Sequence, residues 1–165
     1  RNLVKAFKNG LNVPMPFYVK NHILIMEFLG QNEWPAPQIK DIVLSKAGWN
    51  RAYVECLEFV RLMYQKCELI HADFSEYNVL YHKNATYFID FGQSVVTTHP
   101  RGEEYLRRDL SNISNFFEKK LKNVLSIDLA LVLVKSYIAE EGFDFIEEFL
   151  GIALKVEPNV AMKNL

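Results

Sequence analysis

The stretch Leu69–Phe91, LIHADFSEYNVLYHKNATYFIDF, decides how the rest of this sequence is interpreted. Its apolar segments predict a strand, a polar loop and a second strand in a hairpin-like arrangement, with Asp90 at the end of the second strand. The loop contains His71, Asp73 and Asn78. Two carboxylates and an amide on such a scaffold are groups that can hold magnesium and orient a nucleophile toward a phosphate. The stretch therefore predicts a phosphotransferase loop.

Each polar residue of the stretch has a distinct predicted role. Asp73 can accept or orient the attacking hydroxyl, and Asn78 can supply an amide oxygen to a metal ion. Asp90 can approach the same metal from the neighbouring strand, whereas His71 is expected to orient the loop backbone. A lone loop aspartate is usually a solvated turn residue. The spacing H-x-D-x-x-x-x-N, followed by an apolar strand and D-F-G, is much rarer and favours the functional interpretation.

Composition limits the possibilities around this loop. The chain has 165 residues, half of them apolar, which suits one domain or one lobe of a larger one. Its net charge of -1 gives no overall attraction to nucleic acid or to an acidic membrane, although a local basic patch stays open. No apolar run is long enough for a membrane span. Cys56 and Cys67 are expected to be buried free thiols, which suits a reducing cytosol or nucleus.

The remaining chain is predicted to be mostly helical, with one pair of strands near its start. Hydrophobic periodicity, glycines and prolines place these boundaries. The predicted helices are Asn2–Gly10, Gln38–Ser45, Asn50–Cys67, Glu103–Lys120, Ser126–Glu141 and Asp144–Val156, and the predicted strands before the loop are Phe17–Lys20 and Ile23–Phe28.

The loop also resembles a known family. His71-Ala72-Asp73 with Asn78 looks like a variant of the kinase catalytic loop, and Asp90-Phe91-Gly92 looks like its metal-binding triplet. The longer strings HADFSEYNVLYH and IDFGQSVVTTHPRGEEYLRRD are similar to the RIO family of atypical protein kinases. The Gln93-Ser94-Val95 step and the following His-Pro favour its type-one subgroup. With VPMPFYVKNHILIMEFLG and WPAPQIKD, the resemblance covers roughly residues 1 to 120.

The resemblance implies an α+β, protein-kinase-like fold. Residues 1–30 would form the end of the small N-terminal lobe with the hinge strand, and residues 31–165 the mostly helical large lobe. Met26 would be the gatekeeper, and the backbone of Glu27 and Leu29 would bind adenine. Asp109 would tie the catalytic-loop backbone to the large lobe. Without the resemblance, ILIMEFL is an ordinary buried strand and Asp109 an exposed carboxylate on a helix surface.

The function implied by the resemblance is that of an ATP-dependent serine/threonine protein kinase or an ATPase. ATP with Mg²⁺, or Mn²⁺ in its place, would be the cofactors, and Asp90 would be the acceptor of an aspartyl-phosphate. Family members are associated with small ribosomal subunit maturation. The expected partners are therefore the pre-ribosomal particle and its assembly factors, in the cytoplasm with the nucleus as a second location. No membrane partner is expected, and direct contact with nucleic acid stays open.

The departures from the kinase pattern lie in the small lobe. No glycine-rich or S-T-G-K phosphate loop is found, and no strand lysine precedes the hinge, because Lys5 and Lys8 fall on a predicted helix. We expect a truncated chain that is weakly active or inactive alone. Two alternatives stay open. One is a small-molecule phosphotransferase of the aminoglycoside or choline kinase kind, against which the Gln93–Pro100 string argues, and the other is a non-catalytic scaffold in ribosome assembly.

Overall fold

The computed structural model describes residues 1–136 and 145–151. Its elements mix helices with short strands, as the sequence predicts. The helices are α1 Asn2–Lys8, α2 Lys46–Gln65, α3 Gly102–Glu118 and α4 Ile127–Lys135, with 3-10 turns η1 Ile39–Asp41 and η2 Glu76–Asn78. The strands are β1 Pro16–Lys20, β2 Ile23–Met26, β3 Gly30–Gln31, β4 Trp34–Pro35, β5 Leu69–Ile70, β6 Val79–His82, β7 Ala85–Phe88 and β8 Val95–Val96.

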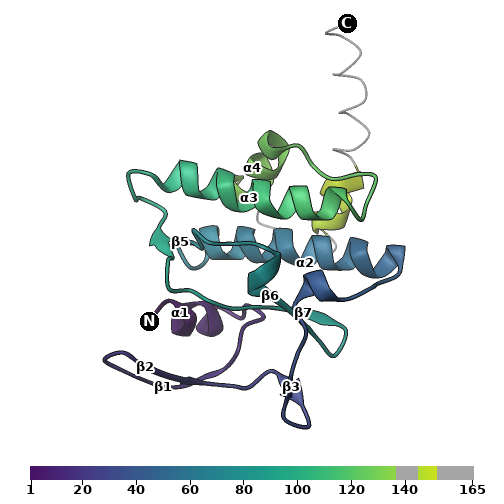
Figure 1. Cartoon of the computed structure of the whole chain (residues 1–165). Helices are drawn as coiled ribbons and strands as arrows, with labels where there is room; N and C mark the ends of the chain where they lie inside the picture. The colour runs from purple at the N-terminus through teal and green to yellow at the C-terminus, as the bar shows by residue number, and fades with distance from the viewer. Residues whose placement is uncertain (137–144, 152–165) are drawn as a thin grey trace, which may run out of the picture.

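Helix α2 is the centre of the molecule, with α3 and α4 on one side and α1 with the β1–β2, β3–β4 and β6–β7 pairs on the other (Figure 1). The β5–β8 pair lies at one end of α2 and also contacts α3. It begins at Lys46, four residues before the predicted start, because the Ser45 hydroxyl caps it by accepting a bond from the Gly48 N–H at 3.1 Å. The predicted helix Gln38–Ser45 is wrong in extent, since only Ile39–Asp41 turns as a 3-10 helix. Ser45 belongs to the next helix as its cap.

An aromatic cluster around Phe59 of α2 packs against the loop. Phe59 stacks on Phe88 with ring centroids 3.9 Å apart and packs against Phe74 at 5.1 Å. The rings of His71 and Phe91 lie 6.1 Å from the same phenyl ring. All five side chains are buried. Side chains from before, within and after the loop thus pack in one apolar cluster, which holds these segments together.

The strands form four separate antiparallel pairs. β6 and β7 pair through a two-residue turn at Lys83-Asn84, where both residues have the positive φ of the hairpin turn that suits twisted strands. The hairpin-like arrangement predicted for the quoted stretch is wrong in its pairing. β5 does not pair within the stretch but with β8, beyond Asp90, so the polar loop connects two different sheets.

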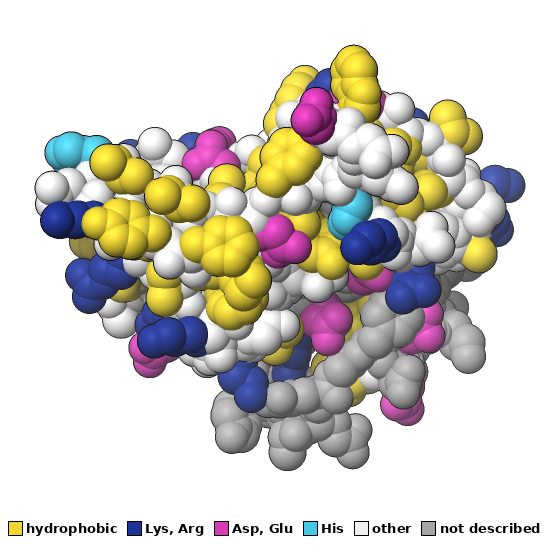
Figure 2. Space-filling view, turned by 90° about the horizontal axis from the view of Figure 1, so that it is seen from below, with side chains coloured by type: hydrophobic (Ala, Val, Ile, Leu, Met, Phe, Trp, Pro, Cys, Tyr) yellow, Lys and Arg dark blue, Asp and Glu magenta, His cyan; other side chains and the backbone are white. Residues whose placement is uncertain are grey.

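The β1–β2 hairpin presents apolar side chains to solvent. All four residues of β2 are exposed, so the alternative interpretation of ILIMEFL as a buried strand is wrong. Figure 2 views the molecule from the side on which this hairpin lies and shows hydrophobic side chains gathered there. The exposed large residues of the hairpin and its end are Phe17, Tyr18, Val19, Ile23, Leu24, Ile25, Met26 and Phe28.

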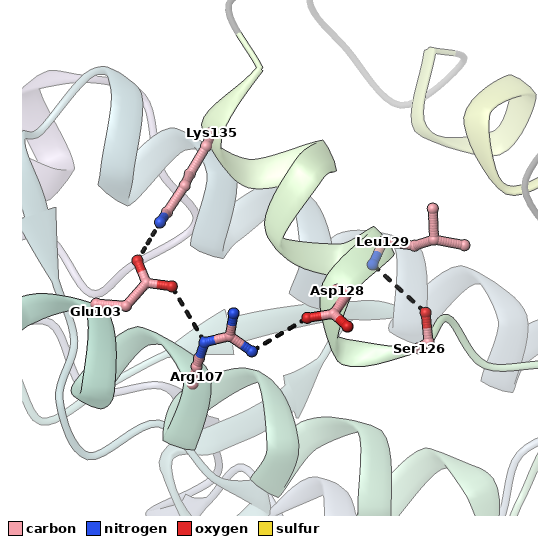
Figure 3. A network of polar contacts seen from close by, with 6 residues as sticks. All are labelled: Glu103, Arg107, Ser126, Asp128, Leu129 and Lys135. Atoms are coloured by element: carbon pink, nitrogen blue, oxygen red, sulfur yellow. Dashed lines mark hydrogen bonds and ion pairs between the residues drawn. The ribbon is translucent and has the colours of Figure 1, made fainter.

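Charged side chains fasten α4 across α3 (Figure 3). Glu103 pairs with Lys135 and, at 3.1 Å, with Arg107, which also reaches Asp128 at 3.1 Å. Ser126, at which the sequence predicts a helix to begin, caps α4, since its hydroxyl accepts a bond from the Leu129 N–H. Exposed ion pairs contribute little one by one, so the network orients α4 more than it stabilises it.

Two side chains of α2 also bind the C-terminal end of α4. Arg61 donates to the Leu133 carbonyl at 2.6 Å, and Gln65 donates to the Val134 carbonyl at 2.7 Å. These bonds satisfy carbonyls that a helix end leaves without partners. The predicted continuation of this helix to Glu141 lies outside the described residues beyond Ser136.

The last predicted helix is described only in part. Residues 145–151 are helical, and the rest of the range Asp144–Val156 lies outside the described residues. Cys56 and Cys67 are free and buried as predicted, and burial raises the pKa of both thiols. Among the helices that the structure describes, none has the length and apolar character needed to cross a membrane. The division into lobes at residue 30 stays a prediction.

Candidate active site

The loop that carries Asp73 runs from β5 to β6 across the side of α3. Ala72 has a φ of +65°, a left-handed conformation that L residues adopt only at a cost. Asp109 of α3 accepts the Ala72 N–H at 2.8 Å and the Phe74 N–H at 3.0 Å, one on each carboxylate oxygen. Asp109 is 1% exposed, which excludes the alternative interpretation of this residue as an exposed carboxylate on a helix surface. The two bonds join the loop backbone to α3, and the supporting role implied for Asp109 stays a prediction.

Burial sets the protonation of this aspartate. Removal from water raises the pKa of Asp109 to about 6, while the two N–H donors and the nearby Arg108 guanidinium act in the opposite direction. At neutral pH the group is therefore ionised and accepts both bonds with full negative charge. Charge-assisted bonds of this kind are stronger than neutral ones.

Two further residues of α3 bind the same loop, and sequence reasoning missed both. The Arg108 guanidinium donates to the Ala72 carbonyl, and the Asn112 amide donates to the Phe74 carbonyl at 3.1 Å. Positions 108, 109 and 112 lie on neighbouring turns of one helix, so their side chains reach a common region. That spacing around Asp109 was the available signal, but polar helix residues usually face water.

Asn78 is fixed by its neighbours in a way that frees its oxygen. Its side-chain nitrogen donates to the Asp73 carbonyl at 2.8 Å, so the amide oxygen points away from that bond and stays available as a metal ligand. Its own carbonyl accepts the Ile89 N–H at 3.1 Å, one residue before Asp90. The main chain thus links three of the predicted site residues. Asp73 and Asp90 are exposed, and Asn78 is half-buried.

His71 makes a second link between the loop and the segment before Asp90. Its Nε2 lies 3.1 Å from the Ile89 carbonyl, and the ring is buried against Phe74 and Phe91. Burial lowers the pKa of His71, so the ring is neutral and its Nε2–H donates to that carbonyl. The placement fits the predicted orienting role, which stays a prediction.

Asp90 lies at a sharp turn beside a cavity. Its φ of +64° turns the chain after β7, and one carboxylate oxygen accepts the Gly92 N–H at 3.3 Å. The carboxylate borders a cavity of about 580 Å³ that is also lined by Leu24 and Met26. The predicted gatekeeper and the predicted metal ligand, 64 positions apart in sequence, therefore face the same space.

Helix α1 holds the chain after Asp90 in place. The Asn2 amide donates to the carbonyls of Phe91 and Ser94, each at 3.3 Å, and Asn2 also lines the cavity. Sequence reasoning missed Asn2, because a single asparagine at the start of a short helix carries no recognisable pattern. The two bonds span about 90 positions of sequence.

Several hydrogen-bonding groups of the predicted adenine-binding segment already have partners within the chain. The Glu27 N–H donates to the Met15 carbonyl at 2.8 Å, and the Glu27 carboxylate accepts the Met15 N–H at 3.1 Å. Glu27 therefore has its carbonyl to offer to a base. Leu29 is buried, and its carbonyl accepts the Ala36 N–H at 2.8 Å. Within the described residues the cavity is lined by Met26 but not by Glu27 or Leu29.

The donor set suits magnesium bound together with phosphate. The described ranges contain no group of three or more His, Cys, Asp or Glu residues that could hold a metal by themselves. Magnesium in nucleotide sites takes one or two carboxylates and completes its shell with phosphate oxygens and water. Asp90 and the free oxygen of Asn78 fit that requirement.

A helical lobe that presents an H-x-D-x-x-x-x-N loop beside a D-F-G turn defines a kinase-like phosphotransferase scaffold. A model of the RIO domain matches residues 1–130, and the chain belongs to the RIO family. The predicted recognition, including the type-one subgroup, is confirmed by the curated relatives. The predicted α+β kinase-like fold is confirmed by the solved structures.

The relatives are named serine/threonine-protein kinases. The chain is 40% identical over 152 residues to rio1 of Dictyostelium discoideum, covering 91% of this chain and 26% of that protein. It is 37% identical over 145 residues to human RIO1, covering 87% and 26%, and 42% identical over 118 residues to human RIO3, covering 72% and 23%. The chain thus spans about a quarter of the length of these curated relatives.

Solved structures of similar fold include the Rio2 kinase of Chaetomium thermophilum in an ADP/Mg²⁺-phosphoaspartate complex. It aligns with a TM-score of 0.64 at 22% identity, covering 96% of this chain and 52% of that one. A second structure of the same kinase aligns with a TM-score of 0.60, also at 22% identity, covering 96% and 53%. At this identity the likeness concerns the fold.

Proposed function

We propose that this chain carries the catalytic loop and metal ligands of a RIO-type, ATP-dependent serine/threonine protein kinase or ATPase. The observation that carries the proposal is the main-chain linkage of the site. Asn78 binds the Asp73 carbonyl with its side chain and the Ile89 N–H with its own carbonyl. The base, the amide ligand and the segment before Asp90 are therefore held in one frame beside the cavity.

The residues have separate tasks in this function. Asp73, exposed at the loop tip, accepts the proton of the attacking hydroxyl. Asp90 and the oxygen of Asn78 hold magnesium, which neutralises developing charge on the phosphates when it is bound. Met26 borders the proposed space for the adenine ring, and the carbonyl of Glu27 is the main-chain group of that residue left to bind adenine.

The ATPase form of the proposal uses Asp90 as a phosphate acceptor. The Rio2 complex contains ADP, Mg²⁺ and a phosphoaspartate, which supports a similar step here. A carboxylate oxygen of Asp90 would bond to the γ-phosphorus of ATP as the bond to the β-phosphate oxygen breaks and ADP leaves. Water would then attack the phosphorus, releasing phosphate and restoring the carboxylate.

The biological setting is also a proposal. The RIO relationship supports a role in maturation of the small ribosomal subunit, with pre-ribosomal particles and their assembly factors as partners. The cytoplasm is the proposed location, with the nucleus as a second one. Co-sedimentation of the full-length protein with pre-40S particles tests the partner. Sedimentation only in the free fraction, with and without nucleotide, would contradict it.

The test of the chemistry is the variant Asp90→Asn in the full-length gene product. We expect loss of magnesium-dependent ATP turnover and of hydroxylamine-sensitive phosphate label on the protein. Asp128→Asn is the matched control, because Asp128 is an exposed carboxylate that pairs with Arg107 on α3. Wild-type turnover in Asp90→Asn would overturn the metal assignment. Transfer of labelled phosphate to a small alcohol, with none to protein, would favour a small-molecule phosphotransferase instead.

A further inference from the structure

The main chain on both sides of Asp73 is held by one helix. Four polar groups flank this residue, namely the N–H and the carbonyl of Ala72 and the N–H and the carbonyl of Phe74. Asp109 accepts both N–H groups, and Arg108 and Asn112 donate to the two carbonyls. All three partners are side chains of α3. Within the described ranges, no other residue of the loop has the N–H and the carbonyl of both its neighbours bound by side chains.

These bonds stabilise an unfavourable backbone conformation in the loop. Ala72 is not glycine, yet it holds a φ of +65° in the left-handed region. Because Ala72 has a side chain, the surrounding structure must hold its backbone in this conformation, since an unrestrained chain would relax to a negative φ. A bond to the Ala72 N–H alone fixes one peptide plane. The Arg108 bond to the Ala72 carbonyl fixes the next plane, which is the one that leads into Asp73.

Arg108 is itself oriented for this contact. Its guanidinium lies over the Tyr105 ring, 5.1 Å from the ring centroid, one turn earlier on the same helix. It also adds positive charge beside Asp109, where it lowers the carboxyl pKa. Its neighbour Arg107 points elsewhere, to Glu103 and Asp128, as Figure 3 shows. Two consecutive arginines of α3 therefore have different tasks.

We propose that Arg108 and Asn112 are positioning residues for Asp73, acting through the carbonyls of Ala72 and Phe74. Within the described residues their hydrogen bonds go to main-chain carbonyls and not to the side chains of Asn78 or Asp90. Arg108 holds the peptide plane that leads into Asp73, and Asn112 holds the plane that follows Phe74, one residue beyond the plane that leaves Asp73. The proposal rests on the function proposed above for Asp73 as the base of phosphoryl transfer. A small displacement of such a base costs rate without a matching loss of binding.

The variants Arg108→Met and Asn112→Leu remove the donors while keeping similar side-chain length. We expect each to lower kcat about tenfold and to leave the KM for ATP within about twofold, because a bond from a donor to a fixed carbonyl is worth about a factor of ten. Arg108→Lys keeps a cationic donor and is expected to recover most of the rate. Arg107→Met and Asn115→Leu are the matched controls, because both residues are exposed positions of α3.

A double-mutant cycle with Asp73→Asn in the full-length protein separates positioning from a general structural effect. If Arg108 acts through Asp73, Arg108→Met has no further effect on kcat once Asp73→Asn is present. An additive loss in the double variant would overturn the positioning role, as would an unchanged kcat in Arg108→Met. If Asp73→Asn alone leaves kcat unchanged, the proposed function of Asp73 fails instead. The same cycle applies to Asn112→Leu.

Discussion

The side-chain nitrogen of Asn78 lies 2.8 Å from the main-chain carbonyl of Asp73 and donates a hydrogen bond to it. One residue therefore closes the loop and at the same time offers its other amide atom, the oxygen, to a metal ion. The donor and the proposed ligand are two different atoms of one planar amide, and an ionised carboxylate, which has no donor, cannot supply both. This explains why the last position of η2 suits an asparagine.

Asn78→Ala is expected to weaken both tasks together. The Asp73 carbonyl loses its donor, and the proposed magnesium site loses one oxygen. We expect the magnesium concentration for half-maximal ATP turnover to rise about 10- to 100-fold, as is common when support of a metal site is removed. Titration of turnover with Mg²⁺ at saturating ATP measures this. Asn115→Ala on α3 is the control, and an unchanged magnesium dependence in Asn78→Ala would contradict the ligand role.

Asp73→Asn is expected to slow phosphoryl transfer and to leave nucleotide binding intact. The substitution keeps the side-chain shape but removes the proton acceptor, whose contribution is about 10²- to 10⁴-fold in rate. Single-turnover kinetics measure the transfer step, and equilibrium titration with a fluorescent ADP analogue measures binding. Asp41→Asn serves as control, since Asp41 is a carboxylate paired only locally with Lys40. A parallel loss of binding and of rate would show that Asp73 supports the fold instead.

Asp109 should make stability depend on pH in a defined window. Its pKa is raised by burial from 3.8 to about 6, so the folded state binds the proton more tightly than the unfolded state. The folded state is therefore favoured by this group below about pH 4, and that contribution is lost as the pH rises from about 4 to about 6. The size is on the order of 3 kcal/mol in the free energy of unfolding.

Urea unfolding at several pH values tests this expectation, with Asp109→Asn as the reference. The asparagine cannot titrate, so the difference in unfolding free energy between the two proteins should change across that window. It should be flat above about pH 7, where the carboxylate is fully ionised. A constant difference from pH 4 to pH 7 would show that the pKa of Asp109 is not raised.

The catalytic pattern could be predicted from sequence because its chemistry is carried by residue type and spacing. Asp73, Asn78 and Asp90 are close in sequence, and the strings around them are specific. Arg108, Asn112 and Asn2 could not be found in this way, because each acts on a main-chain carbonyl 36 to 92 positions away. A carbonyl has no side-chain identity, so no local pattern marks its partner.

The strand pairings show a similar limit. β6 and β7 follow each other across a two-residue turn, and of the two the sequence predicted only the strand before Asp90, which is β7. β5 and β8 have two residues each and lie some 25 positions apart, so their pairing is set by the packing of the segments between them. Ser45 shows the converse case, since a polar residue assigned to one helix proved to be the cap of the next.

The dependence of the loop on α3 has a consequence for synthesis of the protein. The chain passes through Asp73 well before Arg108, Asp109 and Asn112 are made, so a nascent chain that ends before α3 has nothing to hold Ala72 in its left-handed conformation. The base cannot take its working place until the third helix has left the ribosome and docked. Contacts between residues far apart in sequence form more slowly than local ones. Catalytic competence would thus be gained in one step, at the end of the lobe's assembly.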